Sequence, residues 1–311
     1  MKYSVIGAGN CFRLWASAFK ELGLSFCSVC DTDKEKLKSL KYTVYTDLDE
    51  LLRNDGSDCI IVTSPVSTHF EIASKIISAG KSVIVEKPVS YDFSHVESLC
   101  KMAEMRGVDF ICSYHAAFSM DVEHFLANRS SLKEGLGKLL GFECVFYDPY
   151  VINGELLPSS DSLYGSYLDS AVNALSVISR VIGLDGLTPL TDPRQFLRKE
   201  NLFSQTLYKK GSINGVIRTD WRLKKNLKKT LLTYEGGQIL LNHSMQRIEK
   251  SLENQEPEII DCNDCQRERL LNQYLSTIKA IESGKWDIAP HLPMYRLLLG
   301  EKRNDLRNNK A

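Results

Sequence analysis

The hydrophobic residues of the first 112 positions form short runs that alternate with segments of helical spacing. Runs rich in β-branched residues predict strands, and apolar residues three or four positions apart predict helices. The predicted strands are Lys2–Ile6, Leu24–Cys30, Tyr42–Tyr45, Cys59–Val62, Ser82–Val85 and Asp109–Cys112. The predicted helices are Asn10–Leu22, Asp33–Leu40, Asp47–Arg53, Thr68–Ala79 and Tyr91–Arg106.

This alternation predicts βαβ units and an α/β, doubly wound parallel sheet of about six strands. Cys59–Val62 shows no polar alternation, so both faces of that strand are expected to be covered. Thr68 and Glu71 have the spacing of a capping box, which predicts a helix that begins at Thr68. Because such sheets bind ligands at the carboxyl ends of their strands, functional residues are expected directly after the strands.

After residue 112 the predicted strands follow one another, which indicates an α+β domain with a mainly antiparallel sheet. The strands are Lys138–Tyr147, Ser204–Tyr208, Ile213–Trp221, Thr230–Tyr234 and Gln238–Leu241. The helices are about Met120–Arg129, Tyr164–Ile182, Arg267–Ser283 and His291–Gly300. We therefore expect two domains, residues 1–115 and 116–311.

The charge balance and the lengths of the apolar runs exclude some classes of partner. The 311 residues contain 39 basic and 39 acidic side chains, so nucleic acid is not expected as the main partner. No stretch approaches the roughly 18 uncharged apolar residues of a membrane helix. Gly7 and Gly9 interrupt the first apolar run too early for a secretory signal. A soluble, cytoplasmic protein without a membrane partner is expected.

The nine cysteines are scattered, so free thiols are expected. Cys27 and Cys30 lie on a predicted strand, where side chains three positions apart point to opposite faces. Cys262 and Cys265 lie in a polar stretch without the further ligands of a metal site. No metal site is predicted.

Gly7-Ala8-Gly9 follows the first strand and opens the first helix, the context that a dinucleotide-binding fingerprint requires. Gly7 allows a tight turn, and Gly9 allows the backbone to approach a pyrophosphate. The N-terminus of the helix that begins at Asn10 then binds this group. Phe12 stands where the fingerprint has its third glycine.

Asp31 ends the second strand, 22 residues after Gly9, where an acid binds the adenosine ribose hydroxyls. A carboxylate there repels a 2′-phosphate, so NAD is favoured, while Lys34 and Lys36 leave NADP possible. The alternative is that Asp31 caps the next helix, a role that Thr32 or Asp33 could also fill.

Two further motifs stand at strand ends: Thr63-Ser-Pro65-Val-Ser-Thr-His69 and Glu86-Lys87-Pro88. Together with the glycine loop and Asp31, they resemble the Gfo/Idh/MocA family of NAD(P)-dependent oxidoreductases, which includes glucose–fructose oxidoreductase and inositol dehydrogenase. The resemblance covers the first 115 residues strongly and the rest weakly. It implies a Rossmann domain that binds NAD(P), followed by an α+β domain.

The resemblance implies a catalytic or substrate-orienting role for Lys87. Burial and a cationic nicotinamide are expected to lower the pKa of this lysine toward neutrality, so that it can exchange a proton with a substrate hydroxyl. Glu86 is expected to orient Lys87 or the cofactor, and a cis bond is expected at Pro88. The expected cofactor-binding residues are Gly7, Gly9, Asn10, Asp31, Thr63, Pro65, His69, Glu86, Lys87 and Pro88, with His69 in a structural role.

Gly165–Asn173 resembles the family's second-domain stretch, in which an Asp and a following His meet the lysine over the substrate. Asp169 and Asn173 share one helix face, so Lys87, Asp169 and Asn173 form the expected catalytic set. Asn173 replaces the His and cannot exchange a proton near neutral pH. Either Lys87 transfers the proton alone or another group helps. The candidate helpers and substrate contacts are Tyr114, His115, Tyr164 and Tyr167.

These residues predict hydride transfer between a nicotinamide and a carbinol or carbonyl carbon of a sugar, inositol or nucleotide sugar. The alternatives are a non-catalytic cofactor-binding or regulatory protein and a reductase of an imine or conjugated double bond. The basic run 222–229 is interpreted as a solvated face, or as a contact for the phosphates of a nucleotide sugar. By resemblance, a homodimer or homotetramer is expected, formed through the open face of the second sheet.

Overall fold

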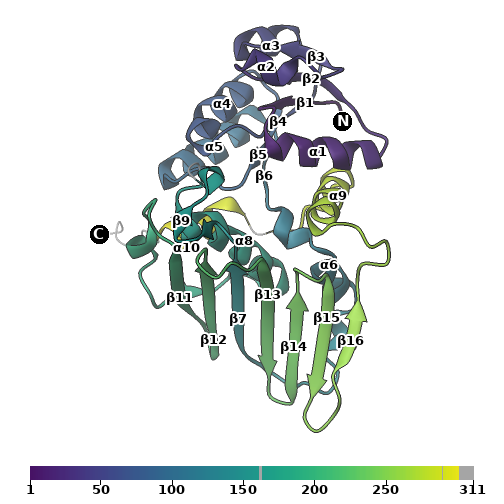
Figure 1. Cartoon of the computed structure of the whole chain (residues 1–311), viewed down its shortest axis with the longest axis vertical. Coiled ribbons are helices and arrows are strands. Elements are labelled where there is room, and N and C mark those ends of the chain that lie inside the picture. The colour runs from purple at the N-terminus through teal and green to yellow at the C-terminus, as the bar shows by residue number, and fades with distance from the viewer. Residues whose placement is uncertain (161–162, 289, 301–311) are drawn as a thin grey trace, which may run out of the picture.

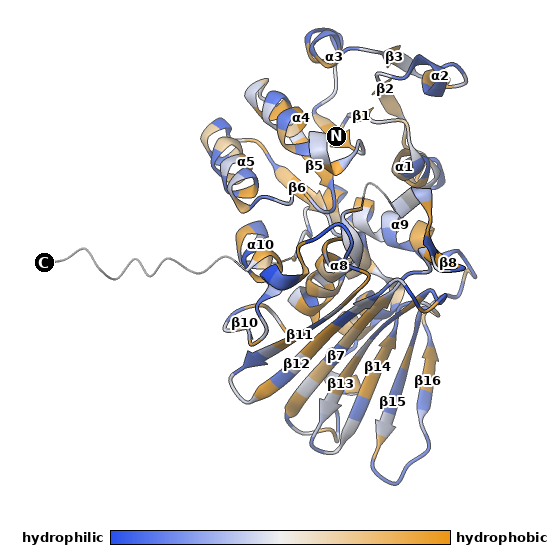
Figure 2. Cartoon of the chain, turned by 60° about the vertical axis from the view of Figure 1, so that its left-hand side comes forward, coloured by the Kyte–Doolittle hydropathy of each residue, from blue (hydrophilic) through white to orange (hydrophobic). Residues whose placement is uncertain are grey.

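A computed structural model describes residues 1–160, 163–288 and 290–300 (Figure 1). Its first sheet has six parallel strands in the order β3-β2-β1-β4-β5-β6, which confirms the doubly wound prediction. The strands are β1 (Tyr3–Ile6), β2 (Phe26–Cys30), β3 (Thr43–Tyr45), β4 (Cys59–Val62), β5 (Ser82–Glu86) and β6 (Phe110–Ser113). In Figure 2, β5 and β6 are hydrophobic along much of their length, in keeping with burial between two layers of helices.

Helices cover both faces of this sheet. They are α1 (Asn10–Glu21), α2 (Lys34–Leu37), α3 (Leu48–Asn54), α4 (Val66–Ser78) and α5 (Phe93–Arg106). α1 packs on the side of Val5 and Ile61, while α4 and α5 pack on the side of Val62 and Val83. The alternation of the strand side chains therefore divides the core into two layers.

The predicted start of α4 is wrong by two residues. Thr68 lies inside the first turn, where its backbone N–H and its hydroxyl both donate to the carbonyl oxygen of Pro65. Pro65 is the N-cap residue, with extended backbone at φ −59° and ψ 143°. A residue already inside the helix cannot cap it, so the spacing of Thr68 and Glu71 was not a capping box.

The second sheet has eight strands in the order β10-β11-β12-β7-β13-β14-β15-β16. Only β7 and β12 pair in parallel, so the mainly antiparallel prediction is confirmed. Its strands are β7 (Leu139–Tyr147), β10 (Thr188–Pro189), β11 (Phe203–Lys210), β12 (Ile213–Asp220), β13 (Leu227–Tyr234), β14 (Gly237–Asn242), β15 (Arg247–Leu252) and β16 (Glu258–Asp261). The short strands β8 (Val151–Ile152) and β9 (Glu155–Leu156) form a separate pair.

α8 (Gly165–Val181) and α6 (Met120–Ala127) lie on one face of the second sheet, beside the short helix α7 (Arg129–Leu132). Almost every residue of α8 is buried, because the sheet lies on one side and the 3-10 helix η1 (His115–Phe118) on another. Two further 3-10 turns are η2 (Pro158–Ser160) and η3 (Pro193–Phe196). Within the described chain no helix covers the opposite face, and association of copies through that face stays a prediction.

The last two helices return to the first sheet. α9 (Arg269–Glu282) packs against α1, and α10 (His291–Leu299) packs against α5 (Figure 1). These two C-terminal helices complete the cover of the N-terminal sheet, although they belong to the predicted second domain. The division of the chain at residue 115 stays a prediction. None of the described helices is long and apolar enough to span a bilayer.

The nine cysteines form no disulfide, and Cys262 is buried whereas Cys265 is exposed. Among residues 1–160, 163–288 and 290–300, no cluster of three or more His, Cys, Asp or Glu side chains could hold a metal ion.

Candidate active site at the edge of the parallel sheet

The glycine loop between β1 and α1 leaves open space beside a helix N-terminus. Gly7 has φ +100°, and a Cβ there would lie 2.7 Å from the backbone nitrogen of Ser64, so only glycine fits. A Cβ at Gly9 would meet no atom within 4 Å. No side chain caps the N-terminus of α1 at Gly9. This loop fits a pyrophosphate, because its backbone N–H groups have room for an anion.

Asp31 lies next to this loop. Its Oδ2 accepts from the backbone N–H of Ala8 at 2.8 Å, and its Oδ1 accepts from that of Asp33 at 2.9 Å. The cap of α2 is Asp33, which accepts from the backbone N–H of Glu35. Asp31 is therefore not the helix cap, and its carboxylate lies at the strand end where a ribose would bind. Lys36 lies 3.5 Å from it.

The residues after β4 hold neighbouring loops together. Thr63 Oγ1 donates to the carbonyl oxygen of Gly7 at 2.6 Å. His69 is buried, with Nε2 2.8 Å from the carbonyl oxygen of Ser64 and Nδ1 3.0 Å from that of Pro88. The Lys87–Pro88 peptide is cis, as the resemblance implied. His69 thus connects the loop that begins at Thr63 to the segment that carries Lys87.

Glu86 is buried at the end of β5 and connects three elements. Its Oε1 accepts from Trp15 Nε1 of α1 and from the hydroxyl of Tyr274 of α9, both at 2.8 Å. Burial raises the pKa of Glu86, although these two donors oppose the shift. Its contact to Lys87 is a backbone one, from the Lys87 N–H to Oε2 at 3.3 Å.

Lys87, which follows β5 of the first sheet, contacts Asp169 of α8, which lies on the second sheet. Lys87 Nζ lies 2.7 Å from Asp169 Oδ1 and 3.1 Å from the Asp169 carbonyl oxygen. Their side chains are 13% and 8% exposed. Burial lowers the pKa of Lys87, but the charge of Asp169 and its hydrogen bond outweigh burial and raise this pKa above its ordinary value. The expected lowering toward neutrality is therefore wrong for the protein alone, because the carboxylate is so close.

Asn173 lies one helical turn after Asp169, as its spacing predicted. Its Nδ2 donates weakly to the Asp169 carbonyl oxygen at 3.4 Å. Its Oδ1 is buried and accepts no hydrogen bond within the described residues. A buried acceptor without a donor costs free energy, so Oδ1 has an unused capacity to accept a hydrogen bond.

His115 follows β6 and lies within electrostatic reach of Lys87. Its Nδ1 is 2.9 Å from Gln273 Oε1, an acceptor, so the proton is on Nδ1 and Nε2 is left as an acceptor. Its ring stacks on that of Tyr274 at 5.1 Å. Burial lowers the pKa of His115 to about 3, and the positive charge of Lys87 acts in the same direction. His115 is therefore a neutral imidazole beside the lysine.

Two of the tyrosines predicted to contact substrate are buried in the core, and a third is exposed. Tyr114 and Tyr167 are fully buried, with their hydroxyls bonded to His291 Nδ1 and to the Leu298 carbonyl oxygen. Those predictions are wrong, because both rings fill the core. Tyr164 is 39% exposed and stacks on Tyr91 at 4.6 Å. Burial raises the pKa of Tyr91, and the charge of Asp169 acts in the same direction, so contact of Tyr164 with substrate stays a prediction.

The sequence did not indicate a second buried ion pair. Lys228 Nζ lies 2.6 Å from Asp148 Oδ1, and the lysine is almost fully buried. The interpretation of 222–229 as a solvated face is therefore wrong at this residue. β13 begins at Leu227 rather than Thr230, which turns Lys228 toward the same face as Thr230. Extending the alternation of β13 backward would have revealed it.

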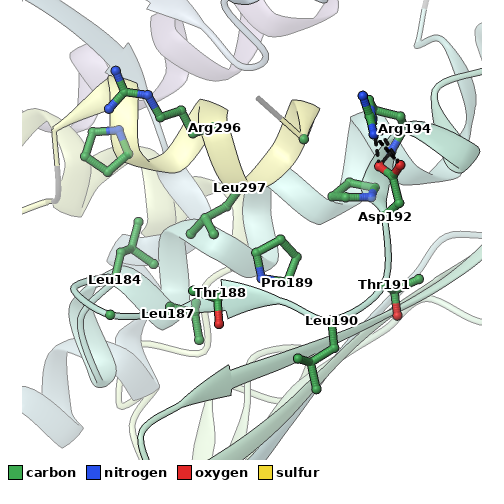
Figure 3. Close-up of a pocket in the computed structure, with 14 residues that line it drawn as sticks. Leu184, Leu187, Thr188, Pro189, Leu190, Thr191, Asp192, Arg194, Arg296 and Leu297 are labelled. Carbon is green, nitrogen blue, oxygen red and sulfur yellow. Dashed lines mark hydrogen bonds and ion pairs between the residues drawn. The ribbon is translucent and has the colours of Figure 1, made fainter. Parts of the chain in front are cut away.

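A cavity of about 540 Å³ lies elsewhere, beside the segment 184–194 and α10 (Figure 3). Its lining is largely apolar, with an Asp192–Arg194 ion pair at one end. It contains none of the predicted site residues.

Comparison with known proteins supports the assignment of the first domain. Residues 1–114 match the model of the Gfo/Idh/MocA family, described as an oxidoreductase family with an NAD-binding Rossmann fold. The resemblance noted in the sequence is confirmed, and the first domain is an NAD-binding Rossmann fold. An uncharacterized oxidoreductase of Schizosaccharomyces pombe is 30% identical over 101 residues, which are 32% of this chain. The matched region spans only 27% of that relative's length.

Solved structures resemble the whole chain in fold. UDP-N-acetylglucosamine 3-dehydrogenase GnnA from Acidithiobacillus ferrooxidans superposes with a TM-score of 0.74 at 16% identity, over 96% of this chain and 94% of that one. An inositol dehydrogenase homolog from Azotobacter vinelandii, complexed with NAD+, gives a TM-score of 0.75 at 13% identity, over 96% and 92%. At these identities the likeness shows the two-domain fold alone.

Proposed function

From a first domain with the NAD-binding Rossmann fold of the Gfo/Idh/MocA oxidoreductases, we propose that this chain is an NAD(P)-dependent dehydrogenase or reductase. It would transfer a hydride between the nicotinamide and a carbinol or carbonyl carbon of a sugar, inositol or nucleotide sugar. The observation that carries the proposal is the 2.7 Å Lys87–Asp169 pair, at the carboxyl end of β5 where doubly wound sheets bind their ligands.

The residues around the glycine loop fit a dinucleotide. Gly7, Gly9 and Asn10 would hold the pyrophosphate, since the loop is open at Gly9 and α1 has no side-chain cap. Asp31 would bind the adenosine ribose, and Thr63 and Pro65 would line the cofactor groove. When bound, the nicotinamide supplies the hydride acceptor or donor.

Lys87 would move the proton. Because Asp169 keeps Lys87 protonated, the lysine is ready to donate to a carbonyl oxygen as hydride arrives at the same carbon. In the reverse direction Lys87 would first release its own proton to solvent water, and the neutral amine would then take the hydroxyl proton as the hydride leaves for the nicotinamide. Asn173 Oδ1 and His115 Nε2 are acceptors without a described partner, and they would hold further substrate hydroxyls. A substrate with several hydroxyls suits such a set.

Two proteins whose folds this chain resembles are named for sugar-like compounds. One is a dehydrogenase of UDP-N-acetylglucosamine, and another is an inositol dehydrogenase homolog. Both names support a sugar-like substrate for this chain.

A second candidate function is non-catalytic cofactor binding, and it is favoured by Asn173. An amide cannot exchange a proton where the resemblance implies a histidine. A third candidate is a reductase of an imine or conjugated double bond. In that reaction no carbinol hydroxyl loses a proton, so the histidine that Asn173 replaces would not be needed.

Replacing Lys87 tests the proposal. We expect Lys87→Met to lower kcat by at least about 100-fold, because general acid–base catalysis contributes roughly 10²–10⁴-fold. Reduction or oxidation of the cofactor is followed by absorbance with sugars, inositols and nucleotide sugars, and the Kd for NADH is expected to stay within about twofold. Lys75→Met is the control, because this exposed lysine pairs only with Asp49 on the surface. Tight NADH or NADPH binding without turnover of any compound would favour the non-catalytic candidate, and absence of binding of both nucleotides would refute both.

A further inference from the structure

Arg269 is a partly buried cation without an ion-pair partner. It is the first residue of α9, and its Nη1 donates to Gln273 Oε1 at 3.3 Å. Within the described residues, no carboxylate oxygen lies within 4 Å of its guanidinium. Burial lowers the pKa of Arg269, while the more distant Asp148 and Asp121 oppose the shift. A guanidinium has five N–H donors, so most of those of Arg269 remain available.

The start of α9 adds positive charge at the same place. Its N-terminus has no side-chain cap and no acidic residue in the first turn. The exposed peptide N–H groups of a helix start carry a partial positive charge, which an arginine at that position does not neutralise. The helix dipole therefore adds to the charge of Arg269, while the N-cap residue Glu268 carries an exposed carboxylate that does not cap the helix.

Arg269 belongs to the same site as Lys87. Gln273 Oε1 accepts from both Arg269 and His115, so the two side chains share one partner. The charges of Lys87, Arg269 and Lys228 all act on His115 and lower its pKa, after burial. Three cations therefore lie within electrostatic range of one imidazole, and one of them, Arg269, also shares the hydrogen-bond partner Gln273 with it.

Two of these cations are paired. Asp169 binds Lys87, and Asp148 binds Lys228. The carboxylate of Asp121 is bonded to His243 in the core. Arg269 is the one of the three without a direct ion pair among the described residues, since Asp148 and Asp121 act on it from beyond 4 Å, and a carboxylate or phosphate in contact would stabilise its partly desolvated charge further.

We propose that Arg269 forms a subsite for an anionic group of the substrate, a carboxylate or a phosphate. The inference rests on the proposed function and narrows its substrate class to polyhydroxylated anions, such as sugar acids or sugar phosphates. A guanidinium fork binds either group through two parallel hydrogen bonds. The hydroxyl-bearing carbons of that substrate would then face Lys87 and Asn173.

Matched neutral and anionic ligands test the subsite. D-glucose is compared with D-glucuronate and D-glucose 6-phosphate, and myo-inositol with its monophosphate, by calorimetric titration of the protein saturated with NADH. We expect at least one anion of each series to bind about tenfold or more tightly than its neutral partner. The uronate and phosphate arms show which anion the subsite accepts.

Arg269→Gln is expected to remove this preference and to leave the Kd for NADH within about twofold. Arg269→Lys keeps the charge without the fork and should retain part of the preference. Arg267→Gln is the matched control, because this exposed arginine lies two residues earlier and pairs with Glu21 at 3.5 Å. NADH binding and the thermal midpoint verify that each variant is folded.

Two results would overturn the subsite. One is equal affinity for every neutral and anionic pair. The other is an anion preference that survives Arg269→Gln unchanged. Turnover of neutral sugars with either result would leave the proposed function standing, whereas failure to bind either NADH or NADPH would remove the proposed function itself.

Discussion

At the scale of the residue, the state of Lys87 follows from its immediate neighbours. A lysine in a partly desolvated place tends to lose its proton, but Asp169 at 2.7 Å reverses that tendency. His115, close to the same lysine, has no carboxylate and is held neutral. The site therefore combines a charged donor with a neutral acceptor, although both groups are buried.

Asp31 gives a prediction at the same scale. We expect Asp31→Ala to weaken NADH binding by about 10–100-fold, because a hydrogen bond to a charged group contributes roughly 1.5–3 kcal/mol. NADPH affinity should fall less, since the lost carboxylate repels a 2′-phosphate. Fluorescence titration with both nucleotides measures this. Asp33→Ala removes only the cap of α2 and should keep NADH affinity. Equal losses in the two variants would mean that loop order, rather than a ribose contact, explains the effect.

At the scale of the element, the loop between β1 and α1 shows why two nearby glycines differ. Gly7 needs its positive φ and has backbone against it, while Gly9 has φ −91° and faces open space. The fold therefore requires the first glycine, whereas the second would be required only by the proposed pyrophosphate.

Alanine substitutions separate these two requirements. Gly7→Ala should lower the free energy of unfolding by about 1–3 kcal/mol, because of its strained φ and the approach to Ser64. Gly9→Ala should leave stability within about 0.5 kcal/mol of wild type but weaken NADH binding about tenfold or more. Urea unfolding and NADH titration of both variants decide the matter. A Gly9→Ala protein that binds NADH normally would contradict the pyrophosphate role.

The motifs of the first sheet could be predicted from sequence because they are local. Each motif directly follows a predicted strand, so the strand ends alone locate the glycine loop, Asp31, Thr63–His69 and Glu86–Pro88. The strand β15 and the edge strand β16 were missed because their residues are largely polar or exposed. The start of α4 was misplaced because Pro65, rather than Thr68, supplies the first helical acceptor.

At the scale of the whole molecule, the two sheets are held together by helices from the C-terminal end. Glu86 of β5 accepts from Trp15 of α1 and Tyr274 of α9. His291 of α10 accepts from the Tyr114 hydroxyl and lies 3.0 Å from the carbonyl oxygen of Phe110 in β6. The N-terminal sheet and the C-terminal helices should therefore unfold together.

The buried imidazoles predict acid sensitivity. Burial lowers the pKa of His291 and brings that of His115 to about 3 from an ordinary 6.5. Because the unfolded chain binds these protons first, the stability they provide is complete above about pH 6.5 and is lost as pH falls toward 3. Each proton can contribute about 1.4 kcal/mol per pH unit.

Urea unfolding from pH 7 to 4 measures this loss. His115→Asn should flatten the decline by up to about 1.4 kcal/mol per pH unit below pH 6. His124→Asn, in α6, is the control. A decline identical to wild type in His115→Asn would contradict the assignment of a neutral buried imidazole.

The sequence by itself determined the doubly wound sheet and the glycine loop, because periodicity and strand ends are properties of neighbouring residues, whereas the choice of Lys87, Asp169 and Asn173 as a catalytic set came from the resemblance to the Gfo/Idh/MocA family. Only the tertiary structure decided that Tyr114 and Tyr167 fill the core, that Lys228 pairs with Asp148, and that Arg269 and His115 share Gln273. Such contacts join segments that lie more than 50 residues apart in most cases, and no local pattern encodes which distant side chains meet.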